Sequence, residues 1–316
     1  MRFGILGDAK IAREKLLPAM RKGGHEIIHL AKRDISQPVD SSVWQDIKIS
    51  SYEDMLKDPD VEAIYNPLPN HLHIDWTIKA LEAGKPVLCE KPLALTLSDI
   101  DRLEAVCQRT GLFVYEGFMV RHHPQWDWIK NLDVGERQMV IAQFSYPPQP
   151  EGNVRNYADM GGGPVWDIGC YCLLAGLMLL GNDASLIASS IVPERHLDVE
   201  KTGSAIINFG DGKHLVFSVS SGASLSQLVR LVGSDGWAEL DVPFNPSGST
   251  TARWAHIDHT PDIRLSAGHI KKFEECDQYQ LMVNDFEMAC QNGKQADFSD
   301  SRLLTSILSK IVHDSK

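Results

Sequence analysis

The start of one strongly apolar segment carries two residues that can do acid–base chemistry. Asp167 and Tyr171 come just before the leucine-rich run 173–180. Four residues apart on a helix, their side chains share one face, where a carboxylate can orient a hydroxyl and a phenol can carry a proton. The structural alternative is an Asp favoured by the helix dipole and a Tyr at the edge of a core. It does not explain why both interrupt one apolar helix.

A second group of residues has the spacing of a phosphate-binding turn. The turn follows a predicted strand at 3–6 and opens a predicted helix at 10–21. Small residues fill the three special places of the fingerprint G-x-G-x-x-G/A, namely Gly7, Ala9 and Ala12. Free backbone N–H groups at Lys10 and Ile11 would face a pyrophosphate. Asp8 is an unfavourable departure, because its carboxylate could cap the helix and compete with phosphates.

Two further charged clusters follow predicted strands. Glu90 and Lys91 come directly after the strand 87–89. A lysine at the carboxyl end of a parallel strand stands where ligands bind, although a solvated turn lysine is the alternative. Lys32 and Arg33 follow the strand 26–31, where two cations favour the 2′-phosphate of NADP. Asp34 would favour NAD instead if its side chain faced the ribose.

The elements needed to position these residues alternate in the first third of the chain. Predicted strands at 3–6, 26–31, 61–65, 87–89 and 112–115 alternate with helices, which indicates a doubly wound parallel sheet. After residue 120 six strand-like runs lie between 139 and 242, and Asp211-Gly212 is a hairpin signal. We therefore expect an α/β domain at 1–120 and an α+β domain with a large, mainly antiparallel sheet at 121–316.

Composition excludes several classes of protein. The chain has 316 residues, is 43% hydrophobic and carries a formal net charge of −11, which argues against nucleic acid or an anionic membrane as partner. The longest apolar run is too short to span a bilayer, and the first strand leaves no room for a signal peptide. The six cysteines show no disulfide or zinc-site spacing. We expect a cytoplasmic protein with reduced cysteines and no metal.

Taken together, the motifs resemble the glucose–fructose oxidoreductase / inositol dehydrogenase / rhizopine-catabolism (Gfo/Idh/MocA) family. Within that family the chain looks most like dihydrodiol and NADP-dependent sugar dehydrogenases. The similarity runs from end to end in layout. It is carried by Gly4-Ile5-Leu6-Gly7, Ile11-Ala12, Tyr65-Asn66-Pro67-Leu68-Pro69-Asn70-His71, Glu90-Lys91-Pro92, Glu116-Gly117-Phe118-Met119-Val120-Arg121, Gly161-Gly162-Gly163 and Asp167-Ile168-Gly169-Cys170-Tyr171.

The resemblance implies a Rossmann domain, a nicotinamide cofactor and a catalytic group assembled from both domains. Lys91, Asp167 and Tyr171 are then expected to converge, with Lys91 lowering the pKa of the Tyr171 phenol and Asp167 orienting the substrate. The family pattern also implies that further residues lie along the cofactor: Leu68, Asn70, His71, Glu90 and Arg121. His71 and His73 open a predicted helix, and a surface or capping role remains the alternative for both. Trp166 is expected to stack on a sugar face or to belong to the core.

The predicted function is NADP(H)-dependent hydride transfer to or from a sugar, polyol or cyclic diol, with oxidation of an aldose to a lactone as the leading reaction. NAD is the alternative cofactor. A non-catalytic sensor of nucleotide or sugar, or an NAD-dependent glycoside hydrolase, are the alternative functions. We also expect a homodimer or larger assembly through the antiparallel sheet, with surface supplied by Leu228, Leu231, Trp237 and Leu240.

Overall fold

The protein is described by a computed structural model that covers residues 1–256 and 268–314. The chain forms two compact units. The first contains residues 1–122 and 277–301, and the second contains residues 123–276 and the chain from residue 302. The segment 277–301 was expected in the second domain but lies in the first unit.

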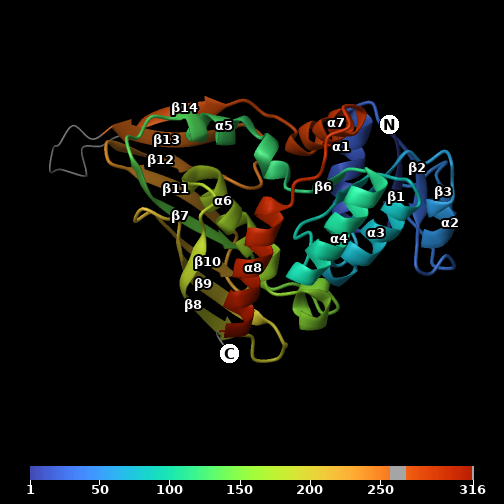
Figure 1. Ribbon diagram of the computed structural model, residues 1–316, viewed down its shortest axis with the longest axis horizontal. Helices are drawn as coiled ribbons and strands as arrows, with labels where there is room; N and C mark the ends of the chain where they lie inside the picture. Colours follow the sequence, from blue (N-terminus) through green and yellow to red (C-terminus); the bar gives the residue numbers. More distant parts are fainter. Residues whose placement is uncertain (257–267, 315–316) are drawn as a thin grey trace. The chain divides into compact units, whose positions relative to one another are not determined.

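The first unit is built on a parallel sheet with the strand order β3-β2-β1-β4-β5-β6 (Figure 1). Its strands are β1 (Arg2–Leu6), β2 (Glu26–Ala31), β3 (Lys48–Ser50), β4 (Ala63–Asn66), β5 (Val87–Cys89) and β6 (Val114–Glu116). The order reverses between β1 and β4, and ligands bind outside the carboxyl ends of strands at such a point. The predicted doubly wound sheet is confirmed, with β3 as a strand that the sequence did not reveal.

The strands of this unit are linked by helices and helical turns, two of which begin at a side-chain cap. These helices and turns are η1 (Ala12–Leu16), α1 (Leu17–Lys22), α2 (Tyr52–Leu56), η2 (Asn70–Leu72), α3 (His73–Glu82), α4 (Leu97–Thr110) and η3 (Met119–His122). Ser51 caps α2, and the Thr96 hydroxyl accepts from Asp99 N at 3.2 Å to cap α4. The N-cap of α4 is therefore Thr96.

Helix α7 (Gln278–Gln291) belongs to this unit because its apolar face fits there. Phe286 is fully buried and its ring packs against Phe3, Phe113 and Tyr115, with ring centroids 6.0 to 6.5 Å apart. Burial of a phenylalanine side chain contributes roughly 1.5–3 kcal/mol. The domain boundary thus follows the aromatic contacts of α7 rather than chain order.

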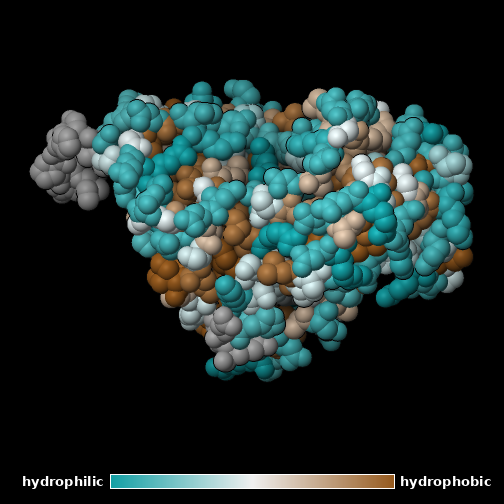
Figure 2. All heavy atoms as spheres, in the orientation of Figure 1, coloured by the Kyte–Doolittle hydropathy of each residue, from teal (hydrophilic) through white to brown (hydrophobic). Residues whose placement is uncertain are grey.

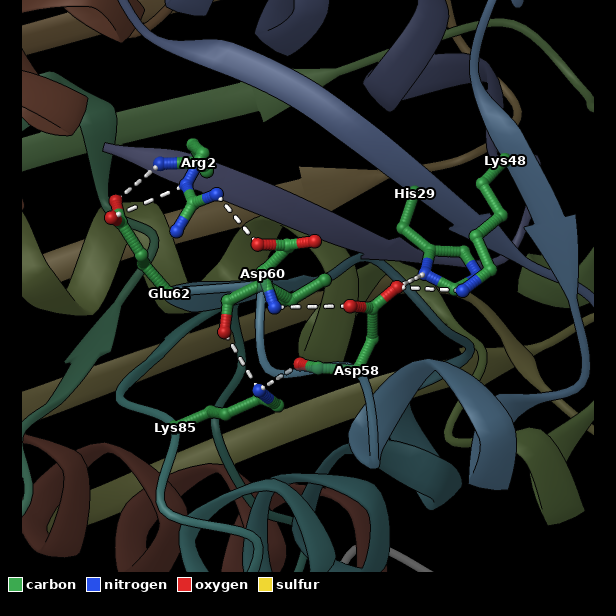
Figure 3. A network of polar contacts seen from close by, with 8 residues as sticks. Arg2, His29, Lys48, Asp58, Asp60, Glu62 and Lys85 are labelled. Atoms are coloured by element: carbon green, nitrogen blue, oxygen red, sulfur yellow. Dashed lines mark hydrogen bonds and ion pairs between the residues drawn. The ribbon is translucent and has the colours of Figure 1, made fainter.

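A polar network holds the amino ends of the strands in the first unit (Figure 3). The Asp58 carboxylate accepts from Lys48 Nζ at 2.8 Å and lies 3.1 Å from His29 Nδ1. The Lys48 hydrogen bond lowers the pKa of Asp58 to about 2. Buried Lys85 donates to the carbonyls of Asp58 and Val61, each at 2.7 Å. This network lies at the edge opposite the strands' carboxyl ends, so we assign it to stability.

The second unit is built on a sheet with the order β14-β13-β12-β11-β7-β10-β9-β8 (Figure 1). Its strands are β7 (Arg137–Ser145), β8 (Ser185–Pro193), β9 (Glu200–Asn208), β10 (His214–Ser220), β11 (Ser226–Gly233), β12 (Gly236–Leu240), β13 (Thr250–His256) and β14 (His269–Phe273). The mainly antiparallel sheet is confirmed, and Asp211 and Gly212 turn β9 into β10 at positive φ. One pairing differs, because β7 and β10 run parallel.

Helix α6 (Cys170–Leu180) is the core helix of the second unit. It continues η6 (Val165–Gly169), a π-helical turn, and packs against β7, β10 and β11. The stretch 158–180 is long and apolar enough to cross a bilayer, but 94% of its apolar window is buried, as in a globular core. The other helical elements of this unit are α5 (Pro124–Asn131), η4 (Val154–Asn156) and η5 (Ala158–Met160), and α8 (Ser299–Asp314) enters it from residue 302.

Candidate active site

The turn after β1 has the geometry of a phosphate cradle. Gly7 adopts φ +85°, and its N–H donates to Ala31 O at 2.8 Å. This φ favours glycine, and a Cβ here would come within 3.1 Å of Leu68 Cδ2, so the position leaves little space for a side chain. The helix that follows starts with the π-helical turn η1, and its first N–H groups have no intrahelical acceptor. These groups are free to meet an anion.

Asp8 in this turn is paired rather than unopposed. Its Oδ1 accepts from Arg13 Nη1 at 2.7 Å and from Trp44 Nε1 at 2.9 Å. The same Arg13 nitrogen donates to the Asp8 carbonyl at 2.6 Å. The carboxylate that seemed to compete with phosphates is therefore held by a cation. The sequence did not reveal this pairing, because Trp44 lies 36 residues away.

At the end of β2 the two predicted cations have different surroundings. The Lys32 side chain is buried, and its ammonium donates to the carbonyls of Gln37 and Pro38. Lys32 therefore fastens the loop after β2. Arg33 is exposed. Asp34 Oδ1 accepts from Ser36 N at 3.0 Å and from Ser36 Oγ at 2.6 Å, and these hydrogen bonds lower the pKa of Asp34.

The loop after β4 is held by a histidine whose role the sequence did not show. His73 is fully buried, and its ring nitrogens lie 2.7 Å from Leu68 O and 2.8 Å from Pro92 O. It thus links the predicted cofactor loop to the segment after Lys91. Asn70 and His71 lie on η2, where His71 is exposed. A surface role for His73 was one expectation, and it is wrong.

The loop that carries Lys91 is fixed by two glutamates. Tyr65 donates its hydroxyl to Glu90 Oε1 at 2.7 Å, so Glu90 serves as an anchor at the end of β5. Glu116 accepts from Leu93 N at 2.8 Å and from Ser301 Oγ at 2.5 Å, and burial raises its pKa. Lys91 is half-buried, and it lies between Glu90 and Leu93, the two residues of this loop that are held by these contacts. Arg121, in η3, pairs with Asp300 at 2.6 Å.

In the second unit the glycine run helps to place an arginine side chain within hydrogen-bonding distance of the Asp167 carboxylate. Gly162 N donates to Tyr157 O and Gly163 N to Arg155 O, each at 2.9 Å. A Cβ at Gly162 would come within 2.6 Å of those same two carbonyls. The two glycines therefore let the backbone pass close to the chain's own loop. That loop carries Arg155, whose Nε donates to Asp167 Oδ2 at 2.5 Å.

Asp167 and Tyr171 occur together with aromatic and charged neighbours. Asp167 lies in the π-helical turn η6 and Tyr171 in the first turn of α6, and both are buried. The Tyr171 ring packs against Phe144 and Phe244, with centroids 5.9 and 5.5 Å apart. The neighbouring Asp167 carboxylate raises the pKa of Arg155, to which Tyr146 and Tyr171 also contribute. Single π-helical turns of this kind recur at functional sites.

The structure thus groups the predicted site residues in two places. The first unit carries the cofactor candidates and Lys91 at the carboxyl ends of its parallel strands. The second unit carries Asp167, Tyr171 and buried Trp166 at the start of α6. Convergence of Lys91 with Asp167 and Tyr171 remains a prediction. The described residues contain no cluster of three or more metal-ligating side chains.

Comparison with known proteins matches both units. Residues 1–118 match an oxidoreductase family with an NAD-binding Rossmann fold, and residues 126–239 match the GFO/IDH/MocA C-terminal domain. A dTDP-3,4-didehydro-2,6-dideoxy-alpha-D-glucose 3-reductase from Actinomadura kijaniata is 32% identical over 93% of this chain and 89% of its own. The chain belongs to the GFO/IDH/MocA oxidoreductase family. The predicted family and fold class are confirmed.

Two further matches extend over nearly the whole chain. D-xylose 1-dehydrogenase (NADP(+)) 2 from Haloferax volcanii is 30% identical over 93% of this chain and 90% of its own. The crystal structure of a 3-ketoreductase from Actinomadura kijaniata with NADP and TDP-benzene superposes with a TM-score of 0.89 and 29% identity. That match covers 100% of this chain and 97% of the other. The similarity of this GFO/IDH/MocA oxidoreductase to its relatives therefore extends over both of its units.

Proposed function

We propose that the protein transfers a hydride between NADP and a carbinol carbon of a sugar, polyol or cyclic diol. The observation that carries the proposal is the row of groups at the carboxyl ends of β1, β2 and β5. There a glycine turn, the exposed Arg33 and Lys91 follow three strands of one parallel sheet, in which β1 and β2 are neighbours and β4 separates β1 from β5. Relatives that act on xylose and on a keto sugar support the substrate class. We infer that the enzyme acts in the cytoplasm.

The residues present fit NADP. The positive φ of Gly7 leaves space for a pyrophosphate over the N-terminus of the first helix. The exposed Arg33 can fork onto a 2′-phosphate, whereas the Asp34 carboxylate, which would favour NAD, accepts from Ser36. Lys32, bound to its own loop, shapes this end of the site instead of contributing a free charge. NAD remains the alternative to be measured beside NADP.

The protein's part in the reaction is proton transfer and orientation. When bound, NADP supplies the hydride acceptor. We assign Tyr171 as the base that takes the proton of the substrate hydroxyl, and Lys91 as the cation that favours the phenolate. Asp167, fixed by Arg155, orients the substrate by accepting from one of its hydroxyls. In the reverse direction the Tyr171 hydroxyl protonates the carbonyl oxygen as it is reduced.

A panel of aldoses, polyols and cyclic diols with NADP tests the proposal, with reduced-nicotinamide absorbance as readout. We expect turnover with an aldose and formation of its lactone. Glycoside cleavage without net reduction of cofactor would indicate the hydrolase alternative. Cofactor and sugar binding without turnover of any compound would indicate a sensor.

A second candidate is reduction of a ketone on a nucleotide-linked sugar. It is favoured by the 3-ketoreductase relatives, which match this chain in sequence and in fold. The same residues would act in the reverse direction, with Tyr171 as the acid. NADPH consumption with a dTDP-linked keto sugar, compared with a free aldose in the forward direction, distinguishes the two candidates.

We also propose that the protein is a homodimer, with the outer face of the second unit's sheet as its interface. One cross-strand row on this face reads Ala188, Ile206, Val216 and Ile141 on β8, β9, β10 and β7. It continues as Arg230, Glu239 and Arg253 on β11, β12 and β13. Hydrophobic surface gathers over β9 and β10 (Figure 2). The apolar half of the row is the proposed contact.

A further inference from the structure

We propose that Arg13 is a positioning residue for the cofactor, because it neutralises the Asp8 carboxylate in the phosphate-binding turn. The inference rests on the proposed NADP binding. Asp8 stands between Gly7 and Ala9, in the turn that would meet the pyrophosphate. In the fingerprint of such turns this place needs only a backbone N–H, and a carboxylate adds a negative charge where anions must bind.

Arg13 and Trp44 hold this carboxylate from two directions. One nitrogen of the Arg13 guanidinium binds both the carbonyl and the side chain of Asp8, at 2.6 and 2.7 Å. The Trp44 side chain is nearly fully buried, and its indole N–H binds the same Oδ1 at 2.9 Å. Both donors lie on one oxygen, so the carboxylate is oriented as well as neutralised. We name these three residues the Asp8 clamp.

The clamp also ties the turn to the loop after β2. Trp44 belongs to that loop, and Lys32 holds the same loop through the carbonyl of Pro38 at 3.5 Å. Arg21, two turns beyond Arg13, donates to Val43 O at 3.1 Å. The pyrophosphate turn and the loop beside Arg33 are therefore joined by side chains of the protein itself. Among these contacts, the ion pair of Arg13 with Asp8 is the one that neutralises a charge, because Lys32 and Arg21 donate to backbone carbonyls.

Electrostatics predicts what the loss of Arg13 would do. Two like charges in a partly solvated site repel each other at short range. Asp8 is 24% exposed and Arg13 32%, so solvent screens part of this repulsion. Removal of the guanidinium should then raise the dissociation constant of NADP roughly tenfold at low salt. The effect should shrink as salt is added.

Cofactor binding by three variants tests the clamp. The variants are Arg13→Gln, Asp8→Asn and the double variant, with calorimetric Kd values for NADP, NAD and 2′-AMP. Arg13→Gln should weaken NADP and NAD alike, because both carry the pyrophosphate, and 2′-AMP less. Asp8→Asn should bind NADP within about threefold of wild type, and it should restore the Arg13→Gln variant to that level. Thermal unfolding of each variant establishes that the fold is intact.

Two matched controls separate the clamp from general charge effects. Arg21→Gln removes a cation from the same helix and a contact to the same loop, but no partner of Asp8, so NADP affinity should be unchanged. Arg33→Gln should weaken NADP and 2′-AMP but not NAD. If Arg13→Gln binds NADP as wild type does, or if Asp8→Asn fails to restore a weakened Arg13→Gln variant, the clamp has no role in binding. Wild type that binds neither NADP nor NAD would overturn the proposed function instead.

Discussion

Tyr171 is the residue on which the proposed chemistry depends most directly. Because its phenol is the proposed proton carrier, Tyr171→Phe should lower kcat by roughly 10²–10⁴-fold while the Kd of NADP changes little. Tyr157, an exposed tyrosine of the same unit, supplies the control, since Tyr157→Phe should keep full activity. Lys91→Ala should also reduce kcat, and raise the pH optimum. Near-normal turnover of Tyr171→Phe would contradict the assignment.

Arg155 is a residue that the sequence analysis did not find. Its only sequence signal is that it precedes the glycine run, and the backbone hydrogen bonds of Gly162 and Gly163 bring it to Asp167. Arg155→Gln should remove positive charge beside Asp167 and Tyr171, lower kcat about tenfold and move the pH optimum for oxidation upward. Arg155→Lys, which keeps the charge, should lose less. The exposed Arg195→Gln is the control, and equal pH profiles for Arg155→Gln and wild type would exclude this role.

At the scale of elements, His73 connects two loops of the candidate site and predicts a pH dependence. A protonated ring could donate to both Leu68 O and Pro92 O, but burial opposes the charge more strongly and lowers the pKa of His73 to about 4. The unfolded chain binds the proton near pH ~6.5, so the free energy of unfolding should fall as pH drops from about 6.5 to 4. The loss is on the order of 3 kcal/mol.

Denaturant unfolding across this range, with His73→Gln beside wild type, measures the effect. The variant should be less stable at neutral pH and show a flatter pH dependence. A ring titration followed by NMR gives an independent readout of His73 itself. A midpoint at or above 6.5 would mean that the two carbonyls offset or outweigh burial, and it would contradict this prediction.

The elements that bear the site were largely predictable, and their fine structure was not. Apolar periodicity and glycine positions predicted the strands that end just before Gly7, Lys32 and Glu90, because both signals are local. The π-helical turns η1 and η6 left no such signal, since each depends on how one helix start is packed. Long-range partners such as Trp44 for Asp8 are also invisible to local patterns.

At the scale of the whole molecule, the antiparallel sheet was predicted but its faces were not assigned correctly. Leu231 and Leu240 were expected on the open surface with Leu228 and Trp237, yet both are fully buried. The cause is the two-residue period of a strand, because positions three apart, such as 228 and 231, point to opposite faces. The segment 277–301 was assigned to the second domain for a related reason, since the contacts of α7 are with residues far away in sequence.

The corrected faces give a sharper prediction for assembly. Ile206 and Val216 lie opposite each other on β9 and β10, and each side chain is 39% exposed. A stable interface needs about 1,000 Å² of buried surface, and a lysine in its apolar centre would be desolvated without a partner. Val216→Lys should therefore convert a dimer into a monomer in light scattering at micromolar concentration. Met288→Lys, which places the same charge on an exposed residue of α7 in the first unit and outside this sheet, should leave the dimer intact. A monomeric wild type, or a dimer that Val216→Lys does not weaken, would show that this face is not the interface.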